Sequence, residues 1–141
     1  DELRPHFLPF LDCLGIIARR FPAVNPETAE ILKTHGLTGE DHITADSAEP
    51  KSIGDYNAFG LMCRGAQKGP GSVEYSHKWL QSLDCIWIDP SRCPDTAKEF
   101  SEYEYERDKN GQVISGYPDA NNHHIDAVRY GTEKIWRRRG K

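Results

Sequence analysis

The apolar residues of this chain fall into short runs, and their spacing alternates along the chain between that of helices and that of strands. Asn25-Pro26-Glu27 combines an N-cap, a proline and an acid at the start of an apolar pattern, which is typical of a helix N-terminus. Helices are predicted over residues 25–35, 51–59, 72–83 and 93–101. A last helix is predicted from Asn121 or Asn122 through Ile135 to the basic tail.

The runs between these helices predict strands. His42–Asp46 and Leu61–Cys63 are short and apolar or β-branched. Cys85–Asp89 opens on four consecutive apolar residues and is predicted to be an interior strand in the same sheet as His42–Asp46. Ile86 and Ile88 should then both be buried. Helices alternating with strands predict a layered α/β or α+β fold.

A hairpin is predicted in the second half of the chain. Glutamate and tyrosine alternate from Glu102 to Glu106, with the period of a strand. Asn110-Gly111 follows, a dipeptide favoured in tight hairpin turns. Glu102–Arg107 should therefore pair antiparallel with Gln112–Tyr117. Tyr103 and Tyr105 should share one face of the first strand, and its three glutamates, Glu102, Glu104 and Glu106, the other.

Composition and cysteine usage narrow the class of protein. The chain has 141 residues, 37% of them hydrophobic and 28% charged, with a mean hydropathy of −0.71. A chain of this length is enough for one domain with its own core. No apolar run reaches the roughly 20 residues that span a bilayer. No secretion signal is recognisable. The four cysteines form no CxxC pair, so we expect reduced thiols, with Cys85 buried in a strand, and no zinc finger.

The charge pattern points to local contacts with DNA phosphates. A net charge of −4 argues against a general nucleic-acid coat, but the C-terminus carries Arg137, Arg138 and Arg139. Such a tail can bind phosphate or simply aid solubility. The loop Lys68–Ser72 opens a helix, a geometry that can bind phosphate through Lys68 and backbone N–H groups, although a plain helix start is the alternative. The loop lacks the GK[ST] ending of an ATP-binding Walker A loop.

Candidate metal ligands lie at a helix start and at a strand end. His123 and Asp126 are three residues apart and so share one helix face. An imidazole and a carboxylate from one turn suit a divalent metal, but a polar first turn without metal is the alternative. Asp46 ends a predicted strand, where carboxylates often serve as ligands; a solvated loop acid is the alternative reading.

Three motifs occur in an order that resembles a known family. They are Ala45-Asp46-Ser47-Ala48-Glu49-Pro50-Lys51-Ser52-Ile53, Lys68-Gly69-Pro70-Gly71-Ser72-Val73, and the run from Pro118 to Tyr130 that contains Asn122-His123-His124-Ile125-Asp126. From about Asn25 to Trp136 the chain resembles the C-terminal nuclease domain of tailed-phage terminase large subunits. The resemblance implies an α/β, RNase H-like mixed sheet flanked by helices, with an accessory β-hairpin.

The resemblance also implies chemistry at particular positions. It predicts an endonuclease that cuts concatemeric double-stranded phage DNA with Mg²⁺ or Mn²⁺, in a two-metal site when the domain is complete. Asp46 matches the middle acid of the family, and His123 and Asp126 match the pair on its C-terminal helix. The acid of the first strand has no clear match in residues 1–24, which are left unassigned and diverged; Asp12 is the only nearby candidate.

The remaining implications concern partners and context. Residues 25–141 are expected to form the nuclease domain, without the ATPase domain. The expected partners are double-stranded DNA, that ATPase domain, the small terminase subunit and the portal, with no membrane. The expected location is the packaging complex in the cytoplasm of an infected or lysogenic bacterial host. An inactive or truncated remnant that binds DNA or a partner is the alternative.

Overall fold

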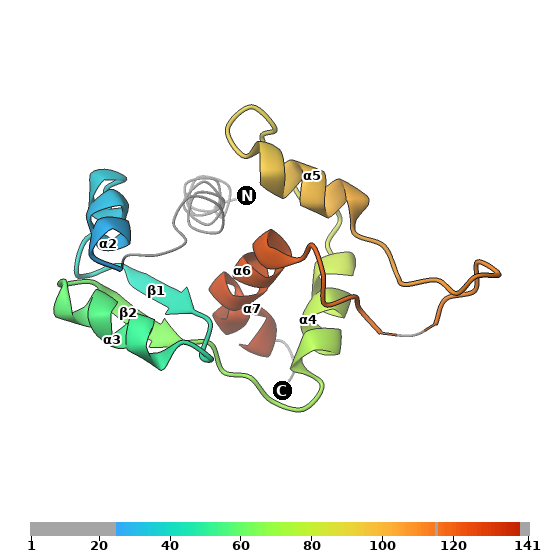
Figure 1. Cartoon of the computed structure of the whole chain (residues 1–141), viewed down its shortest axis with the longest axis horizontal. Helices are drawn as coiled ribbons and strands as arrows, with labels where there is room; N and C mark the ends of the chain where they lie inside the picture. The colour runs from blue at the N-terminus through green and yellow to red at the C-terminus, as the bar shows by residue number, and fades with distance from the viewer. Residues whose placement is uncertain (1–24, 115, 139–141) are drawn as a thin grey trace.

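The computed structural model describes residues 25–114 and 116–138, and a parallel strand–helix–strand unit forms its first half. Strand β1 (His42–Ala45) pairs in parallel with β2 (Met62–Gly65), with His42 opposite Met62 and Ala45 opposite Gly65. Parallel neighbours need a long crossover, which α3 (Pro50–Ala58) supplies. Both strands were predicted. The carboxyl ends of both lead into loops at one edge of this small sheet (Figure 1).

Helix α2 (Asn25–Thr34) covers this unit. Its buried residues Ala29 and Leu32 pack with Leu61, just before β2, to form one hydrophobic cluster. The helix ends where Gly36 adopts a positive φ of 90°, a conformation that glycine reaches without steric cost. The cluster fixes α2 on the same side of the molecule as α3 (Figure 1).

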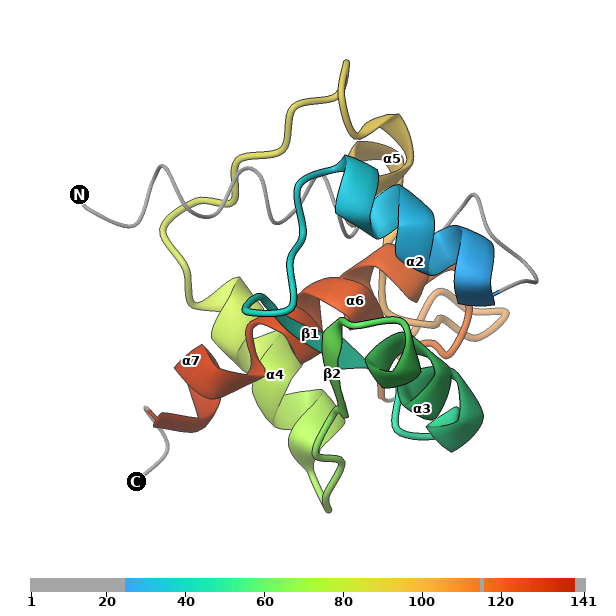
Figure 2. The same cartoon turned by 90° about the vertical axis from the view of Figure 1, so that its left-hand side faces the viewer.

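A second cluster holds the helices of the second half. Helix α4 (Ser72–Gln81) contributes Leu80, and α6 (His123–Gly131) contributes Ile125 and Val128. Helix α5 (Pro94–Glu102) lies against α6, where the carboxylate of Glu99 accepts the backbone N–H of Ile125 at 2.7 Å. This carboxylate satisfies an N–H group that a helix start leaves without a partner. Helix α6 also contacts β1, so it joins the two halves (Figure 2).

The predicted last helix is divided in two. Helix α6 ends at Gly131, and α7 (Glu133–Arg138) begins after Thr132. Gly131 is a weak helix former, and Glu133 is drawn inward to 3% exposure. There its carboxylate accepts the Arg64 guanidinium at 2.7 Å and the Gln67 backbone N–H at 2.9 Å. The break therefore lets α7 anchor the segment after β2. None of the helices in the described part of the chain could cross a membrane.

The predicted interior strand at Cys85–Asp89 is wrong. The segment is an extended loop with no strand pairing; Trp87 is 74% exposed, Ile86 is 39% exposed and Cys85 is also exposed. An apolar run indicates a strand only when a neighbour offers backbone partners and cover. In the described residues the sheet has two strands, β1 and β2, and neither reaches this segment.

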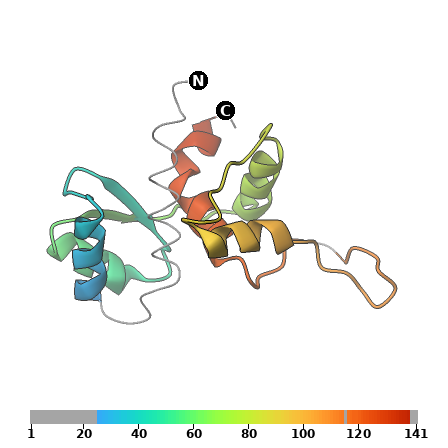
Figure 3. The same cartoon turned by 90° about the horizontal axis from the view of Figure 1, so that it is seen from above.

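The hairpin prediction is confirmed at its tip and wrong at its base. Arg107 and Val113 form an antiparallel bridge, the Ile114 N–H donates to the Glu106 carbonyl at 2.9 Å, and Gly111 has a φ of 79°. Glu102 instead ends α5. Residues 103–105 form no strand pairing. Tyr103 and Tyr105 do line one pocket, but Glu104 lines the same pocket and does not lie on an opposite face. The tip projects away from the helices (Figure 3).

A buried histidine joins the base of this hairpin to α4, and it makes the stability of the fold sensitive to pH. The ring of His77 stacks on Tyr103 and Tyr117. Burial, with a smaller effect from Arg129, lowers the pKa of His77 from 6.5 to about 4. The unfolded chain therefore binds the extra proton between these values, so stability is complete above pH 6.5 and falls as the pH drops toward 4.

We predict a loss of about 2 kcal/mol in the free energy of unfolding between pH 7 and pH 5 that is due to His77 alone. Urea denaturation at the two pH values measures it. His77→Phe keeps an aromatic ring but has no titrating group. Between pH 7 and pH 5 its free energy of unfolding should therefore fall by about 2 kcal/mol less than that of the wild type. The exposed His35 provides the control, because His35→Gln should keep the full loss. An equal loss in His77→Phe and the wild type would contradict the assignment.

Candidate functional site

The candidate site begins at the carboxyl ends of the two parallel strands. Asp46 directly follows β1, and Lys68 lies in the loop that follows β2. Their side chains form an ion pair, with 2.5 Å between the Lys68 Nζ and the Asp46 Oδ1. The same carboxylate oxygen accepts the Ala48 backbone N–H at 2.8 Å. The Lys68 ammonium also lies 5.5 Å from the centre of the Tyr130 ring.

These contacts keep Asp46 ionised. Partial burial alone would raise the pKa of Asp46, but the hydrogen bonds from Ala48 and Lys68 outweigh it, and the pKa lies below its ordinary value. The pKa of Lys68 is raised, chiefly by its hydrogen bond to Asp46. Both groups are therefore charged at neutral pH. Because both side chains are nearly half exposed, the pair should exchange readily with other charged partners.

The second carboxylate, Asp126, lies in the first turn of α6 and is held by a buried cation. Its Oδ1 pairs with the Arg129 guanidinium one turn later. Arg129 is almost fully buried, and its Nε donates to the Ser76 hydroxyl on α4 at 2.6 Å. Ser76 in turn donates to the Ser72 carbonyl at 2.7 Å. This chain of contacts fixes the direction of the Asp126 side chain from a neighbouring helix.

Electrostatics at Asp126 differ from those at Asp46. Burial is the main cause of a raised pKa at Asp126; Arg129 opposes it, and the negative charges of Asp119 and Asp46 add to it. The Asn122 side-chain amide bridges Asp119 and Asp126, at 3.5 and 3.4 Å. Like charges that raise one another's pKa are relieved by a proton or a cation. The arrangement around Asp126 therefore favours a positive ligand.

Asp46 and Asp126 face the same pocket of about 540 Å³. Asp119 and Glu133 also line it, as do Lys68 and Arg129. Glu133 is engaged by Arg64, which leaves three aspartates facing two cations. Mg²⁺ and Mn²⁺ prefer carboxylate oxygens as ligands, so the chemical type of the side chains in this pocket suits such an ion. Within residues 25–114 and 116–138, however, no three acidic, histidine or cysteine side chains are grouped closely enough to hold a metal.

The other predicted site residues lie in different places. His123 is exposed and lines an adjoining pocket with acids of α5, such as Glu99 and Glu102. Arg137 donates to the Gln67 backbone carbonyl and stacks on the Trp136 ring. Arg138 closes α7, while Asp12 and Arg139 lie outside the described residues.

Sequence reasoning did not single out Arg129, Asp119 or Ser76. Arg129 could have been found, because it lies three residues after Asp126, the spacing of an ion pair on one helix face. Asp119 lies in an irregular segment, and Ser76 lies 53 residues before Arg129, so neither spacing carries a local signal.

Comparisons with known proteins agree on one family. A model described as the terminase RNase H-like domain matches residues 19–134. The terminase large subunit of Bacillus phage SPP1 is 46% identical over 100 residues, which are 70% of this chain and 24% of that protein. The PBSX phage terminase large subunit of Bacillus subtilis (strain 168) is 34% identical over 107 residues, 75% of this chain and 24% of that protein.

A solved structure is also similar. The crystal structure of the large terminase nuclease domain from bacteriophage SPP1 with bound Mn matches with a TM-score of 0.70 and 40% identity, over 80% of this chain and 64% of that one. The match confirms the predicted RNase H-like α/β fold. The chain spans about a quarter of the length of the curated relatives.

The Arg129 contacts lead to a stability prediction. Arg129→Met leaves the partly buried Asp126 without its cation, and it should lower the free energy of unfolding by roughly 3 kcal/mol, as loss of one partner of a buried pair does. Lys78→Met removes a cation from a fully exposed pair with Glu74 and should have little effect. Chemical denaturation at pH 7 compares the two variants. If Arg129→Met costs no more than Lys78→Met, Arg129 does not hold the site.

Proposed function

The chain belongs to the family of terminase RNase H-like domains, and from this we propose that it is a divalent-metal-dependent DNA endonuclease domain. One observation carries the proposal. Asp46 and Asp126 are 80 positions apart in the sequence, yet both face one pocket together with Asp119. The negative charges of Asp119 and Asp46 contribute to the raised pKa of Asp126, and such a cost to the fold is relieved when a cation binds.

We propose Asp46 and Asp126 as ligands of Mg²⁺ or Mn²⁺. The motif predicts His123 as the third ligand, although its side chain lines the adjoining pocket in this structure. Such ions lower the pKa of bound water and stabilise the leaving oxygen of a phosphodiester. Two ions would act in the complete domain. Asp12, or another acid outside the described residues, would then supply a further ligand.

The cations of the pocket have a separate role. When Asp46 takes a metal ion, the Lys68 ammonium loses its partner and can contact a DNA phosphate oxygen. Arg129 is buried and already bonded to Ser76, so it stays in place and holds Asp126 toward the pocket. Lys68 is therefore proposed to bind substrate, and Arg129 to position a ligand. Arg137, Arg138 and Arg139 are proposed as further phosphate contacts.

The biological setting follows from the relatives. We propose that the domain cleaves concatemeric double-stranded phage DNA during genome packaging, in the cytoplasm of an infected or lysogenic bacterium. Its partners there would be the terminase ATPase domain, the small terminase subunit and the portal.

A domain that binds DNA without cutting it is the second candidate. It is favoured by the ion pair between Lys68 and Asp46, which occupies one proposed ligand, and by the lack of a three-residue metal cluster in the described part of the chain.

A plasmid-nicking assay distinguishes the two candidates. We predict weak, sequence-nonspecific nicking that is stronger with Mn²⁺ than with Mg²⁺, because Mn²⁺ tolerates imidazole ligands better and Mg²⁺ depends more on a full set of oxygens. Asp46→Ala and Asp126→Ala should each abolish nicking. Asp41→Ala removes a nearby acid outside the pocket and should leave it unchanged.

Two results would contradict the proposal. Nicking that survives Asp126→Ala would exclude the proposed site. DNA binding without nicking at any Mn²⁺ concentration would favour the second candidate. Brisk cutting with Mg²⁺ would instead show that a further acid is present, and Asp12→Ala would test the first suspect.

A further inference from the structure

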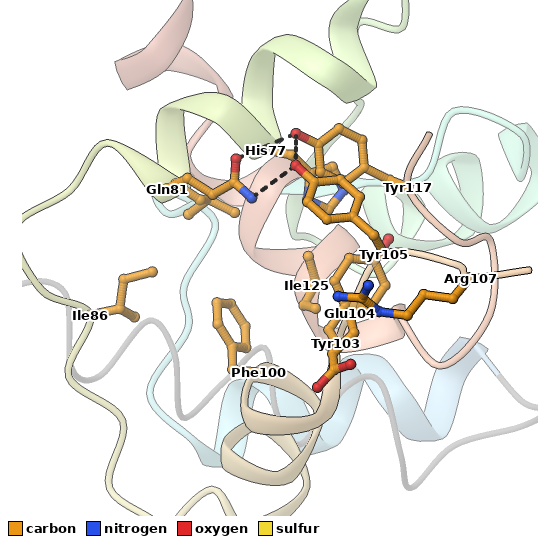
Figure 4. Close-up of a pocket in the computed structure, with 11 residues that line it drawn as sticks. His77, Gln81, Ile86, Phe100, Tyr103, Glu104, Tyr105, Arg107, Tyr117 and Ile125 are labelled. Carbon is orange, nitrogen blue, oxygen red and sulfur yellow. Dashed lines mark hydrogen bonds between the residues drawn. The ribbon is translucent and has the colours of Figure 1, made fainter. Parts of the chain in front are cut away.

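An aromatic pocket of about 420 Å³ lies at the base of the hairpin (Figure 4). It adjoins the pocket that Asp46 and Asp126 line. The His77 ring from α4 is nearly parallel to the rings of two tyrosines. It lies 4.0 Å from Tyr117 and 5.5 Å from Tyr103, centre to centre, and is tilted 8° from each. The Tyr105 ring lies 5.3 Å from that of Tyr117 at 39°. The wall of the pocket is therefore built from aromatic rings that already contact one another.

The open wall of the pocket is both apolar and able to form hydrogen bonds. Tyr105 is 41% exposed, and the exposed Ile86 lies across from it (Figure 4). The Gln81 amide and the hydroxyls of Tyr105 and Tyr117 form a ring of contacts, all 3.4 Å long. Bonds of this length are weak, so these groups can turn toward the polar edge of a ligand.

The charges around the pocket are balanced and do not favour an anionic ligand group. Glu104 and Arg107 both line the pocket, so one negative and one positive charge face it, and the Arg107 guanidinium also donates to the Gly111 carbonyl at 2.9 Å. The low pKa of His77 leaves its ring uncharged at neutral pH. The pocket therefore has no excess positive charge to select a phosphate, whereas a planar, uncharged ring with a hydrogen-bonding edge matches its aromatic and amide lining. A nucleobase is such a ring.

The pocket lies next to the proposed cleavage site. His77, Tyr103 and Tyr117 line both pockets, so only one layer of side chains separates the aromatic wall from Asp126. A DNA strand with a phosphate beside the aspartates could therefore place a neighbouring base at the tyrosines. In duplex DNA every base is already stacked, so the ligand must be an unpaired base.

We propose that the pocket between Tyr105, Tyr117 and Ile86 binds an unpaired nucleobase of DNA by stacking. The proposal rests on the proposed function only in taking DNA as the ligand. It assigns the hairpin base to holding a frayed or single-stranded nucleotide next to the aspartates, whether or not cleavage follows.

The test compares duplex DNA carrying a short thymine overhang with the same blunt duplex, by fluorescence anisotropy in EDTA and at low salt. Tyr105→Leu should weaken binding of the overhang duplex at least about fivefold, the effect of losing one base–aromatic stack. Tyr105→Phe keeps the ring and should bind within about twofold of the wild type. Tyr75→Leu removes a tyrosine with the same 41% exposure outside the pocket and should change nothing.

A second readout reports on stacking itself. A single 2-aminopurine in the overhang should lose fluorescence on binding the wild type and keep it with Tyr105→Leu. Three results would each overturn the proposal. The wild type and Tyr105→Leu could bind the overhang duplex equally well, Tyr105→Leu could weaken binding of the blunt duplex as much as that of the overhang duplex, or the wild type could fail to quench 2-aminopurine. Plasmid nicking is measured separately. If the wild type nicks DNA but Tyr105→Leu changes neither binding nor quenching, only the stacking proposal is wrong. If the base stacks but no nicking occurs, only the nuclease proposal is wrong. No DNA binding at all overturns both.

Discussion

The buried guanidinium of Arg129 is the interaction on which the site depends. A charge removed from water must be paired, and Arg129 finds its partners on two helices, Asp126 on α6 and Ser76 on α4. The backbone carbonyl of Arg129 also accepts the Trp136 indole N–H at 2.9 Å, which ties in α7. The guanidinium therefore joins two helices and one proposed ligand, and the backbone carbonyl of the same residue joins the third helix.

The same electrostatic logic explains the rest of the pocket. Asp46 is paired with an exposed lysine that can leave, whereas Asp126 is paired with a buried arginine that cannot. One carboxylate is thus held rigidly and the other is available for exchange, and Asp119 adds negative charge beside them. This asymmetry suits a site that takes up a cation and a phosphate together, because the displaced lysine can turn from the acid to the phosphate.

Sequence patterns predicted the elements whose signals are local. The proline-started helices, the strands on either side of α3 and the Asn110-Gly111 turn were all predicted, because caps, turns and short-range periodicity determine them. Cys85–Asp89 was predicted wrongly, since an apolar run becomes a strand only beside a partner. The convergence of Asp46 on Asp126 was expected from family resemblance alone. Its support from Arg129 and Ser76 depends on packing between helices, which local spacing does not report.

The most direct test of the account is Mn²⁺ binding without DNA, followed by the electron paramagnetic resonance signal of free Mn²⁺. The chain should remove Mn²⁺ from solution, and Asp46→Asn and Asp126→Asn should each weaken this binding at least tenfold while Asp41→Asn should not. Lys68→Met should strengthen it, because Asp46 then has no competing cation. Unchanged Mn²⁺ binding in both Asp46→Asn and Asp126→Asn would contradict the account, since no metal would then lie between these carboxylates.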